Sequence, residues 1–267
     1  YGAACKDSEW FAQQLTADDT GVFAAGFLTK ELAEYQRENG SDEGRRLFEQ
    51  EYYCSFSAAT RGAYYASLIE QARHEKRITR VPHDPALQVH TAWDLGIGDA
   101  TAIWFFQRAG RERRFIDYHE ASGVGLDYYV QHMRQKPYTY ADVPAILPHD
   151  AEAKELGTGK SRREVLQGLG VKSVIAPRLS VDDGINAVRM ALPLVYMDEE
   201  KCARGIECLE NYRADYDERN KVLRASPRHD WTSHGADAFR YFAAADRQES
   251  RSVGRARQHR RQPGFVV

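Results

Sequence analysis

The sequence predicts an α/β fold in which helices flank a mixed sheet of about five strands. Three strand-like runs follow one another between residues 87 and 121, separated only by a glycine turn and by RAGRE, and this spacing predicts an antiparallel meander. From residue 125 to residue 177, helical and strand-like patterns alternate, which predicts parallel pairing. With 267 residues, of which 42% are hydrophobic, the chain can bury a core of this size.

Each element is inferred from apolar periodicity and from the turn residues that separate the runs. A C-terminal glycine, for example, closes the helix predicted in SRREVLQGLG. The strands are expected at residues 87–96, 101–107, 113–121, 143–150 and 171–177. The helices are expected at residues 125–136, 161–170, 181–195, 200–215 and 232–245.

The two ends of the chain differ from this central part. Residues 1–60 are polar and helix-prone, with two helical stretches broken near Gly40 and Ser41, and we interpret them as a linker or the tail of another domain. Residues 61–246 would form the folded domain. Residues 247–267 carry six arginines and one acid, which predicts a disordered basic tail, either merely solvated or in contact with DNA phosphates or a protein partner.

The composition sets broad limits on function. The 37 basic and 39 acidic residues nearly cancel, so a nucleic-acid surface must come from local clusters of charge. No run approaches the roughly 20 apolar residues of a membrane span, and the first residues lack a signal-peptide pattern, so we expect no membrane partner and a cytoplasmic location. The four cysteines form no C-x-x-C pair, which favours reduced thiols over a zinc site.

A glycine-rich loop, KELGTGKS at residues 154–161, ends like a nucleotide-binding P-loop. The motif requires a glycine where this chain has Lys154, which disfavours nucleotide hydrolysis here. The loop is instead expected to hold a nucleic-acid backbone at the carboxyl edge of the sheet. The alternative is an ordinary loop that Ser161 caps into a helix. The predicted DNA contacts are Lys154, Lys160, Arg162 and Arg163.

Aspartates stand at the ends of two predicted strands. Asp94 ends the first strand and Asp150 the fourth, and if these strands are neighbours, both carboxylates lie at one edge of the sheet. Asp237 lies in the first turns of the last helix, among small residues that allow the helix to approach the sheet closely. Such a cluster repels itself unless cations enter it. The sequence therefore predicts that Asp94, Asp150 and Asp237 form one site.

Carboxylate oxygens suit Mg²⁺ or Mn²⁺. Two such ions about 3.5–4 Å apart can clamp the attacking water and the leaving oxygen of a phosphodiester. Asp99, across the Gly96–Gly98 turn from Asp94, is a further candidate ligand, either directly or through water. The pattern thus predicts phosphodiester hydrolysis with two metal ions.

Structural alternatives exist for each of these residues. Asp99 is equally well explained as a turn former, and Asp150 could cap a helix over AEAKEL. Asp237 could simply pair with Arg240, one turn along the helix. The weaker candidates are Asp230 and Glu120, each better explained as a cap or an ion-pair partner, and His234, which could orient a ligand or be structural.

Four motifs in order, WDLGIGDATAIW, DYHEASG, PHDA and HDWTSHGADAFRY, resemble the nuclease domain of the large terminase subunit of tailed bacteriophages. The segment FEQEYYCSFSAATRGAYYA also resembles the stretch that follows the ATPase core in that family. The resemblance extends to about residue 246. It implies an RNase H-like fold and a metal-dependent endonuclease that cuts concatemeric viral DNA, with the metal-binding aspartates at Asp94, Asp150 and Asp237.

The resemblance also implies partners and a domain context. The implied partners are double-stranded DNA, the small terminase subunit and the portal or procapsid, in the cytoplasm of a bacterial host. Family members carry an N-terminal ATPase with a true P-loop, and this chain would begin within the closing helices of that domain. It would then be a fragment or a truncated product, without motor activity of its own.

Two other interpretations compete with a packaging endonuclease. One is a catalytically silent docking module that binds the portal or procapsid through the sheet and the basic tail. The presence of all three aspartates favours the nuclease over this module. The other is a different RNase H-like enzyme, such as a junction resolvase or an RNA-cleaving nuclease, which substrate choice would distinguish.

Overall fold

The computed structural model describes residues 15–53, 62–96, 99–217 and 222–259. Within these residues, the main sheet is mixed and has the strand order β1-β7-β4-β3-β2-β5-β6. The strands are β1 (Ile78–Thr79), β2 (Val89–Asp94), β3 (Ala100–Ala109), β4 (Glu112–Ser122), β5 (Tyr140–Leu147), β6 (Ser173–Ile175) and β7 (Val195–Asp198). Antiparallel β2, β3 and β4 form the predicted meander, and β5 joins β2 in parallel.

The sheet has seven strands where the sequence predicted about five. The two additional strands, β1 and β7, lie at one side of the sheet, beyond β4; β7 is parallel to β4 and β1 is parallel to β7. They contain two and four residues, which is too short for a periodic pattern to predict. A separate hairpin of β8 (Ala214–Asp217) and β9 (Val222–Pro227) was also missed, and its first strand begins inside the helix predicted at 200–215.

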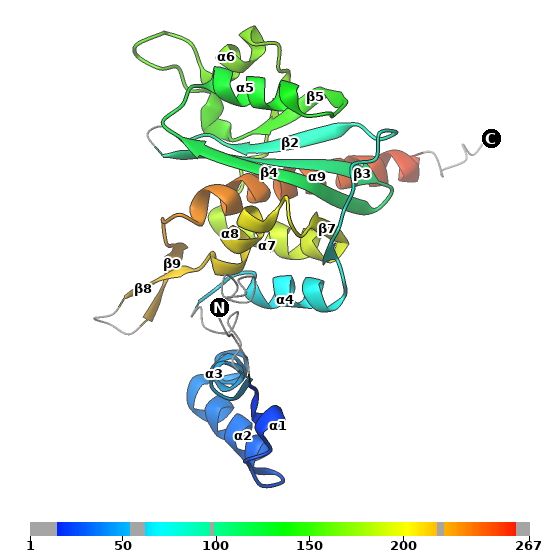
Figure 1. Ribbon diagram of the computed structural model, residues 1–267. Helices are drawn as coiled ribbons and strands as arrows, with labels where there is room; N and C mark the ends of the chain where they lie inside the picture. Colours follow the sequence, from blue (N-terminus) through cyan, green and yellow to red (C-terminus); the bar gives the residue numbers. More distant parts are fainter. Residues whose placement is uncertain (1–14, 54–61, 97–98, 218–221, 260–267) are drawn as a thin grey trace, which may run out of the picture.

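Helices cover both faces of the sheet (Figure 1). One face carries α5 (Leu126–Gln135) and α6 (Arg162–Gly168), and the other carries α4 (Ala66–His74), α7 (Val181–Ala191), α8 (Ala203–Asn211) and α9 (Ser233–His259). Helix α7 ends before the predicted residue 195, because the ring of Pro193 cannot continue a helix. Short 3₁₀ helices lie at η2 (His149–Glu152) and η3 (Leu192–Leu194).

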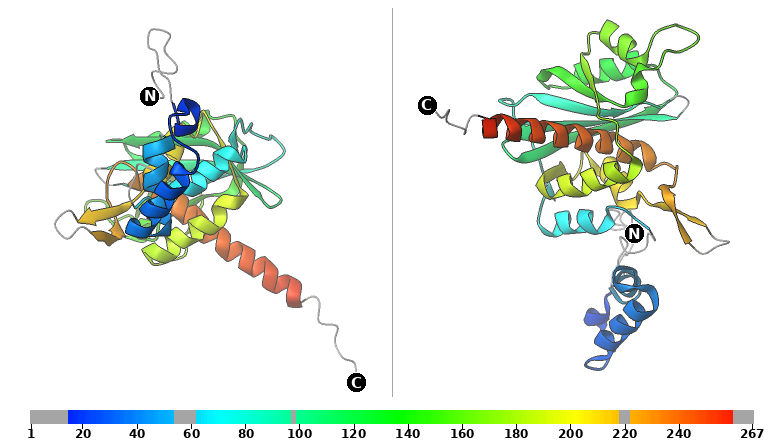
Figure 2. Two further views of the ribbon diagram at one scale, coloured as in Figure 1. Left: turned by 90° about the horizontal axis from the view of Figure 1, so that it is seen from below. Right: turned by 180° about the vertical axis from the view of Figure 1, so that it is seen from behind.

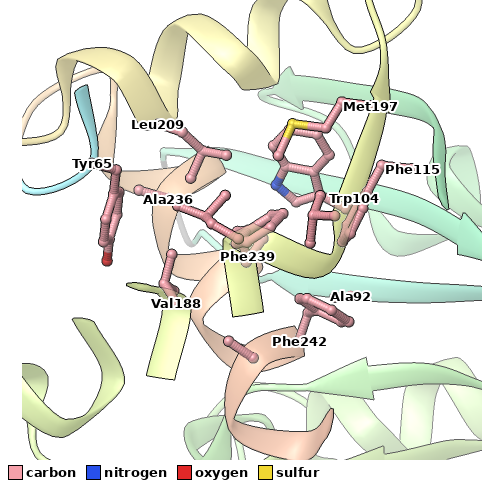
Figure 3. Close-up of a cluster of buried hydrophobic side chains, with 14 of the residues drawn as sticks. Tyr65, Ala92, Trp104, Phe115, Val188, Met197, Leu209, Ala236, Phe239 and Phe242 are labelled. Carbon is pink, nitrogen blue, oxygen red and sulfur yellow. The ribbon is translucent and has the colours of Figure 1, made fainter. Parts of the chain in front are cut away.

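Strand β3 explains why the core has two halves. Side chains alternate between the faces of a strand, so Ile103 and Phe105 pack under α5 while Trp104 and Phe106 face α9. All four side chains are fully buried. Figure 3 shows the second half, in which Trp104 and Phe115 of the sheet pack against Phe239 and other side chains of the surrounding helices. This packing fixes α9 across the sheet.

The last helix is longer than predicted. Its backbone is helical to His259, so residues 247–259 are not the unstructured tail that the sequence predicted, and residues 260–267 lie outside the described part. Figure 2 shows this end of α9 extending beyond the sheet. Arginine, glutamine and alanine are good helix formers, so a helix that is anchored by packing can continue through them.

The described N-terminal part is helical, as predicted. It contains α1 (Ala17–Thr20), α2 (Phe27–Asn39) and α3 (Ser41–Tyr53), with the break at Gly40. Aromatic contacts among Phe23, Phe27 and Tyr52 hold these helices together. They lie apart from the sheet in Figure 1. Among the described residues, no helix is long and apolar enough to span a membrane.

Candidate active site

Strand pairing brings two of the three aspartates to one edge of the sheet. In the parallel pair of β2 and β5, Thr91 lies opposite Ala145 and Ala92 lies opposite Ile146. Asp94 is the last residue of β2, and Asp150 lies in η2, immediately after β5. Because AEAKEL does not form an α-helix, Asp150 is not the cap of one. The expected neighbourhood of the two strand ends is confirmed.

Helix α9 brings Asp237 to the same edge. The indole Nε1 of Trp104 in β3 donates a hydrogen bond of 2.8 Å to the carbonyl oxygen of Gly235. A Cβ atom at Gly235 would lie only 2.8 Å from both the Tyr118 hydroxyl and the Cys208 Cβ, so glycine permits this close approach. Ala236 and Ala238 are fully buried. The prediction that small residues allow close packing of the helix is confirmed.

Two side chains of α9, His234 and Tyr241, interact with the aspartates. Burial raises the pKa of Tyr241 above its ordinary value, and the negative charges of Asp94, Asp237 and Asp150 raise it further. The imidazole Nδ1 of His234 lies 3.1 Å from the Asp94 carboxylate, and this contact raises the pKa of His234. The His234 contact joins α9 to Asp94 at the end of β2.

Each aspartate is paired with a nitrogen-bearing side chain. Asp94 contacts His234, Asp150 accepts a hydrogen bond of 3.0 Å from Arg162, and Asp237 lies 3.1 Å from the Arg240 guanidinium. Within the described residues, no three His, Cys, Asp or Glu side chains are arranged as a ready metal-binding group. The carboxylates are turned toward their separate partners, and the predicted pair of Asp237 with Arg240 is present.

The chemistry of these side chains nevertheless fits a divalent cation. Burial raises the pKa of Asp237 to about 6, Arg240 opposes that rise, and the negative charge of Asp94 adds to it. A cation placed between these carboxylates would relieve their repulsion. All three side chains offer hard oxygen ligands, which Mg²⁺ and Mn²⁺ prefer.

Asp99 lies beside this edge but is exposed. Its carboxylate lies 3.7 Å from the Nε2 of His229, and its charge contributes to the raised pKa of His234. Residues 97 and 98 of the turn lie outside the described part. The ligand role of Asp99 therefore stays a prediction.

The basic loop divides into exposed and buried residues. Lys154 and Lys160 are exposed, as phosphate contacts need to be, and Arg163 pairs with Glu152. Ser161 caps α6 with a capping box, so the interpretation of a loop capped into a helix is confirmed. Arg162 differs from the prediction because it is only 8% exposed.

Arg162 joins the ends of the two central strands instead of facing solvent. Its guanidinium donates to the carbonyl oxygen of Leu95 at 2.7 Å, and to the carbonyl oxygen and the carboxylate of Asp150 at 3.1 and 3.0 Å. A phosphate contact would require these buried hydrogen bonds to break. Sequence alone could not separate Arg162 from Arg163, because burial depends on which face of α6 meets the strand ends.

Sequence reasoning missed two hydroxyl groups near Asp237. The Tyr212 hydroxyl donates a hydrogen bond of 3.1 Å to the Asp237 carboxylate, and Tyr241 lies one turn further along α9. The spacing of His234, Asp237 and Tyr241 by three and four residues places them on one helix face and could have revealed Tyr241. No comparable local signal marks Tyr212, which follows α8.

The weaker candidates have the structural roles that were favoured for them. Glu120 accepts a hydrogen bond of 2.8 Å from Arg204, as an ion-pair partner. Asp230 accepts hydrogen bonds from the backbone and hydroxyl of Thr232, as a turn-forming cap before α9.

Known proteins provide an independent comparison. No protein-family model matches the chain. The sequence is 26% identical over 221 residues to the large terminase subunit of Escherichia phage T5, covering 76% of this chain and 47% of that protein. The chain is similar to phage large terminase subunits. The resemblance seen in the sequence motifs is thereby confirmed.

Solved structures of a large terminase show the same fold. The large terminase of a thermophilic bacteriophage matches over 91% of this chain and 57% of its own, with a TM-score of 0.53 and 17% identity. The complex of that terminase with ATP-gamma-S gives a TM-score of 0.55 at the same identity. This chain thus spans about half the length of the large terminase subunits that it matches.

Proposed function

We propose that this chain is a metal-dependent endonuclease that cuts concatemeric double-stranded viral DNA during genome packaging by a terminase. The observation that supports this proposal is the parallel pairing of β2 with β5, at or just beyond the ends of which Asp94 and Asp150 stand, together with the contact of His234, one turn before Asp237 on α9, with Asp94. The similarity to a phage protein named terminase large subunit supports the biological setting.

In this proposal Asp94, Asp150 and Asp237 would hold two Mg²⁺ or Mn²⁺ ions, with Asp99 as a further ligand. Bound metal would supply an activated water and stabilise the leaving oxygen of the phosphodiester. The chain's own residues position the carboxylates. Arg162 ties the end of β2 to the segment that holds Asp150, and the Tyr212 hydroxyl orients Asp237.

DNA would approach over the exposed part of the basic loop. Lys154 and Lys160 are exposed there and can neutralise phosphates without breaking internal contacts. Replacing Lys160 by Met should weaken binding to DNA of every sequence and flatten its salt dependence. The small terminase subunit and the portal or procapsid are proposed as further partners on the same grounds of similarity, in the host cytoplasm.

Cleavage of supercoiled plasmid tests the proposal directly. The purified chain would be incubated with Mn²⁺, Mg²⁺ or a chelator, beside the Asp94→Ala variant. The matched control is Asp182→Ala, which removes an exposed carboxylate in the first turn of α7. We expect metal-dependent nicking and linearisation by the wild type and by Asp182→Ala, and loss of cutting in Asp94→Ala.

Two results would contradict this assignment. Wild-type cutting by Asp94→Ala would show that the predicted carboxylate is not required. Absence of cutting by a folded chain that still binds DNA would favour the docking module instead.

A further inference from the structure

A cavity of about 430 Å³ has His234, the side chain that contacts Asp94, in its wall. Its walls come from the start of β3, the end of β4, α8 and the segment before α9, and they include Asp99, Glu120, Arg204, His229, Trp231 and His234. The volume falls within the range of small-ligand sites, about 300–1,000 Å³. Because His234 also contacts Asp94, the cavity begins where the proposed cleavage site ends.

One wall of this cavity contains a cation stacked over an aromatic ring. Trp231 is 44% exposed, and the Arg204 guanidinium carbon lies 4.2 Å from its ring centroid. The Nε of Arg204 also donates a hydrogen bond of 2.8 Å to Glu120, which fixes the guanidinium over the indole. Exposed indole and guanidinium planes are the surfaces on which unpaired bases stack.

The other polar groups of the cavity suit a base better than a phosphate. Glu120 pairs with Arg204 and accepts a hydrogen bond from the Tyr118 hydroxyl, and the Asp99 carboxylate lies 3.7 Å from His229; both carboxylates keep lone pairs that can accept further hydrogen bonds. Carboxylates disfavour a phosphate but accept hydrogen bonds from an exocyclic amino group, such as N4 of cytosine. Thymine presents a carbonyl oxygen at that position and offers these carboxylates only its N3–H, whereas the cytosine amino group carries two donor hydrogens.

We propose that this cavity binds one unpaired nucleobase of the DNA strand beside the scissile phosphodiester, stacked against the layered pair of Arg204 and Trp231, and that it prefers cytosine to thymine. The position beside the scissile bond rests on the proposed endonuclease function. The binding of a base rests on the cavity alone. The consequence is that an opened or single-stranded segment is held at the site more tightly than an intact duplex of the same length.

Binding of short single strands without metal tests this proposal independently of cleavage. Fluorescence anisotropy in chelator would measure the affinity of the full chain for labelled oligo-dC and oligo-dT of six nucleotides. The variants are Trp231→Ala, which removes the aromatic ring, and Trp231→Phe, which keeps an aromatic face. Tyr128→Ala is the matched control, because Tyr128 is an exposed aromatic residue of α5 that does not line this cavity.

We expect oligo-dC to bind wild type several-fold more tightly than oligo-dT. Trp231→Ala should weaken oligo-dC binding by about tenfold or more, as typical of the loss of one stacked base. Trp231→Phe and Tyr128→Ala should stay within about threefold of wild type. Equal binding of oligo-dC and oligo-dT by wild type overturns the proposal without any variant, and so does undiminished binding by a folded Trp231→Ala protein.

The outcomes separate this inference from the proposed function. Plasmid cutting that depends on Asp94, together with unchanged binding by Trp231→Ala, would refute the base site and leave the endonuclease intact. Trp231-dependent binding of oligo-dC by a chain that cuts no DNA with any metal would establish the base site and refute the endonuclease.

Discussion

Replacement of Arg162 by methionine tests how the site is built. Methionine keeps an unbranched side chain of similar length but removes the guanidinium. The hydrogen bonds to the Leu95 carbonyl and to the Asp150 carbonyl and carboxylate are then lost. The ends of β2 and β5 lose their direct polar link, although the apolar packing of α6 remains.

The stability that Arg162→Met loses depends on which of its former hydrogen-bond partners stay buried without a donor. The Asp150 side chain is 53% exposed and can be rehydrated, so the full cost of an unpaired buried charge does not apply. The main loss is that of the hydrogen bonds to two carbonyl oxygens; a bond with a charged donor is worth about 1.5–3 kcal/mol when buried, as at Leu95, and less when partly exposed, as at Asp150. We therefore expect Arg162→Met to lower the free energy of unfolding by about 2–4 kcal/mol, and the melting temperature by roughly 5–12 °C.

Arg163→Met is the matched control. Arg163 is the next residue of α6. It pairs with the exposed Glu152, an ion pair that contributes only about 0–1 kcal/mol, and it donates one long hydrogen bond of 3.3 Å to the Ser173 carbonyl, so its loss should cost much less than that of Arg162. Urea unfolding in chelator would give the free energy of each variant. A salt titration of DNA binding would show whether either arginine contacts phosphate, since loss of one contact reduces the slope by about one.

The two variants should therefore separate the effect on stability from the effect on DNA binding. Arg162→Met should lose stability but keep the salt slope, whereas Arg163→Met should keep its stability and flatten the slope. An Arg162→Met protein as stable as wild type, with a reduced salt slope, would refute our reasoning and restore Arg162 as a DNA contact.

Two further predictions concern packing and pH. Gly205→Ala in α8 would place its Cβ within 2.4 Å of Trp104, so urea unfolding should show a loss of about 2 kcal/mol, whereas Gly168→Ala, with nothing within 4 Å, should be neutral or stabilising. A Gly205→Ala protein as stable as wild type would contradict the close approach of α8 to the Trp104 ring. The rings of His119 and His132 stack at 3.8 Å, and burial, with the neighbouring His132, lowers the pKa of His119 to about 4. The folded state keeps the His119 ring neutral, whereas the unfolded chain takes up a proton below about pH 6.5. The free energy of unfolding should therefore be constant above about pH 6.5 and fall by about 1–2 kcal/mol, after allowance for solvent screening, between pH 6.5 and 4. His119→Phe should lose part of this dependence in melting curves recorded from pH 8 to 4, and an unchanged profile would count against the shift.

Much of the fold could be predicted because it depends on local patterns. The apolar run around Trp104 identifies β3, and the short turns on either side leave only a meander for β2, β3 and β4. The strands β1 and β7 could not be predicted, because a strand of two or four residues is defined by its partner rather than by its own sequence. The length of α9 likewise depends on the packing that anchors its first half.

The sequence by itself determined which residues can form the site. Asp94 and Asp150 follow apolar runs, and Asp237 follows a run of small residues, so their places at a strand end and on a close-packed helix are local properties. The pairing of Asp237 with Arg240 within one helix is likewise local. Tertiary structure alone decided the partners of the other two carboxylates: His234 contacts Asp94, and Arg162 contacts Asp150. It also brought Trp231 and Arg204 into one cavity wall. The physical reason is that periodicity acts over a few residues, whereas burial and ion pairing depend on contacts between elements up to 140 residues apart.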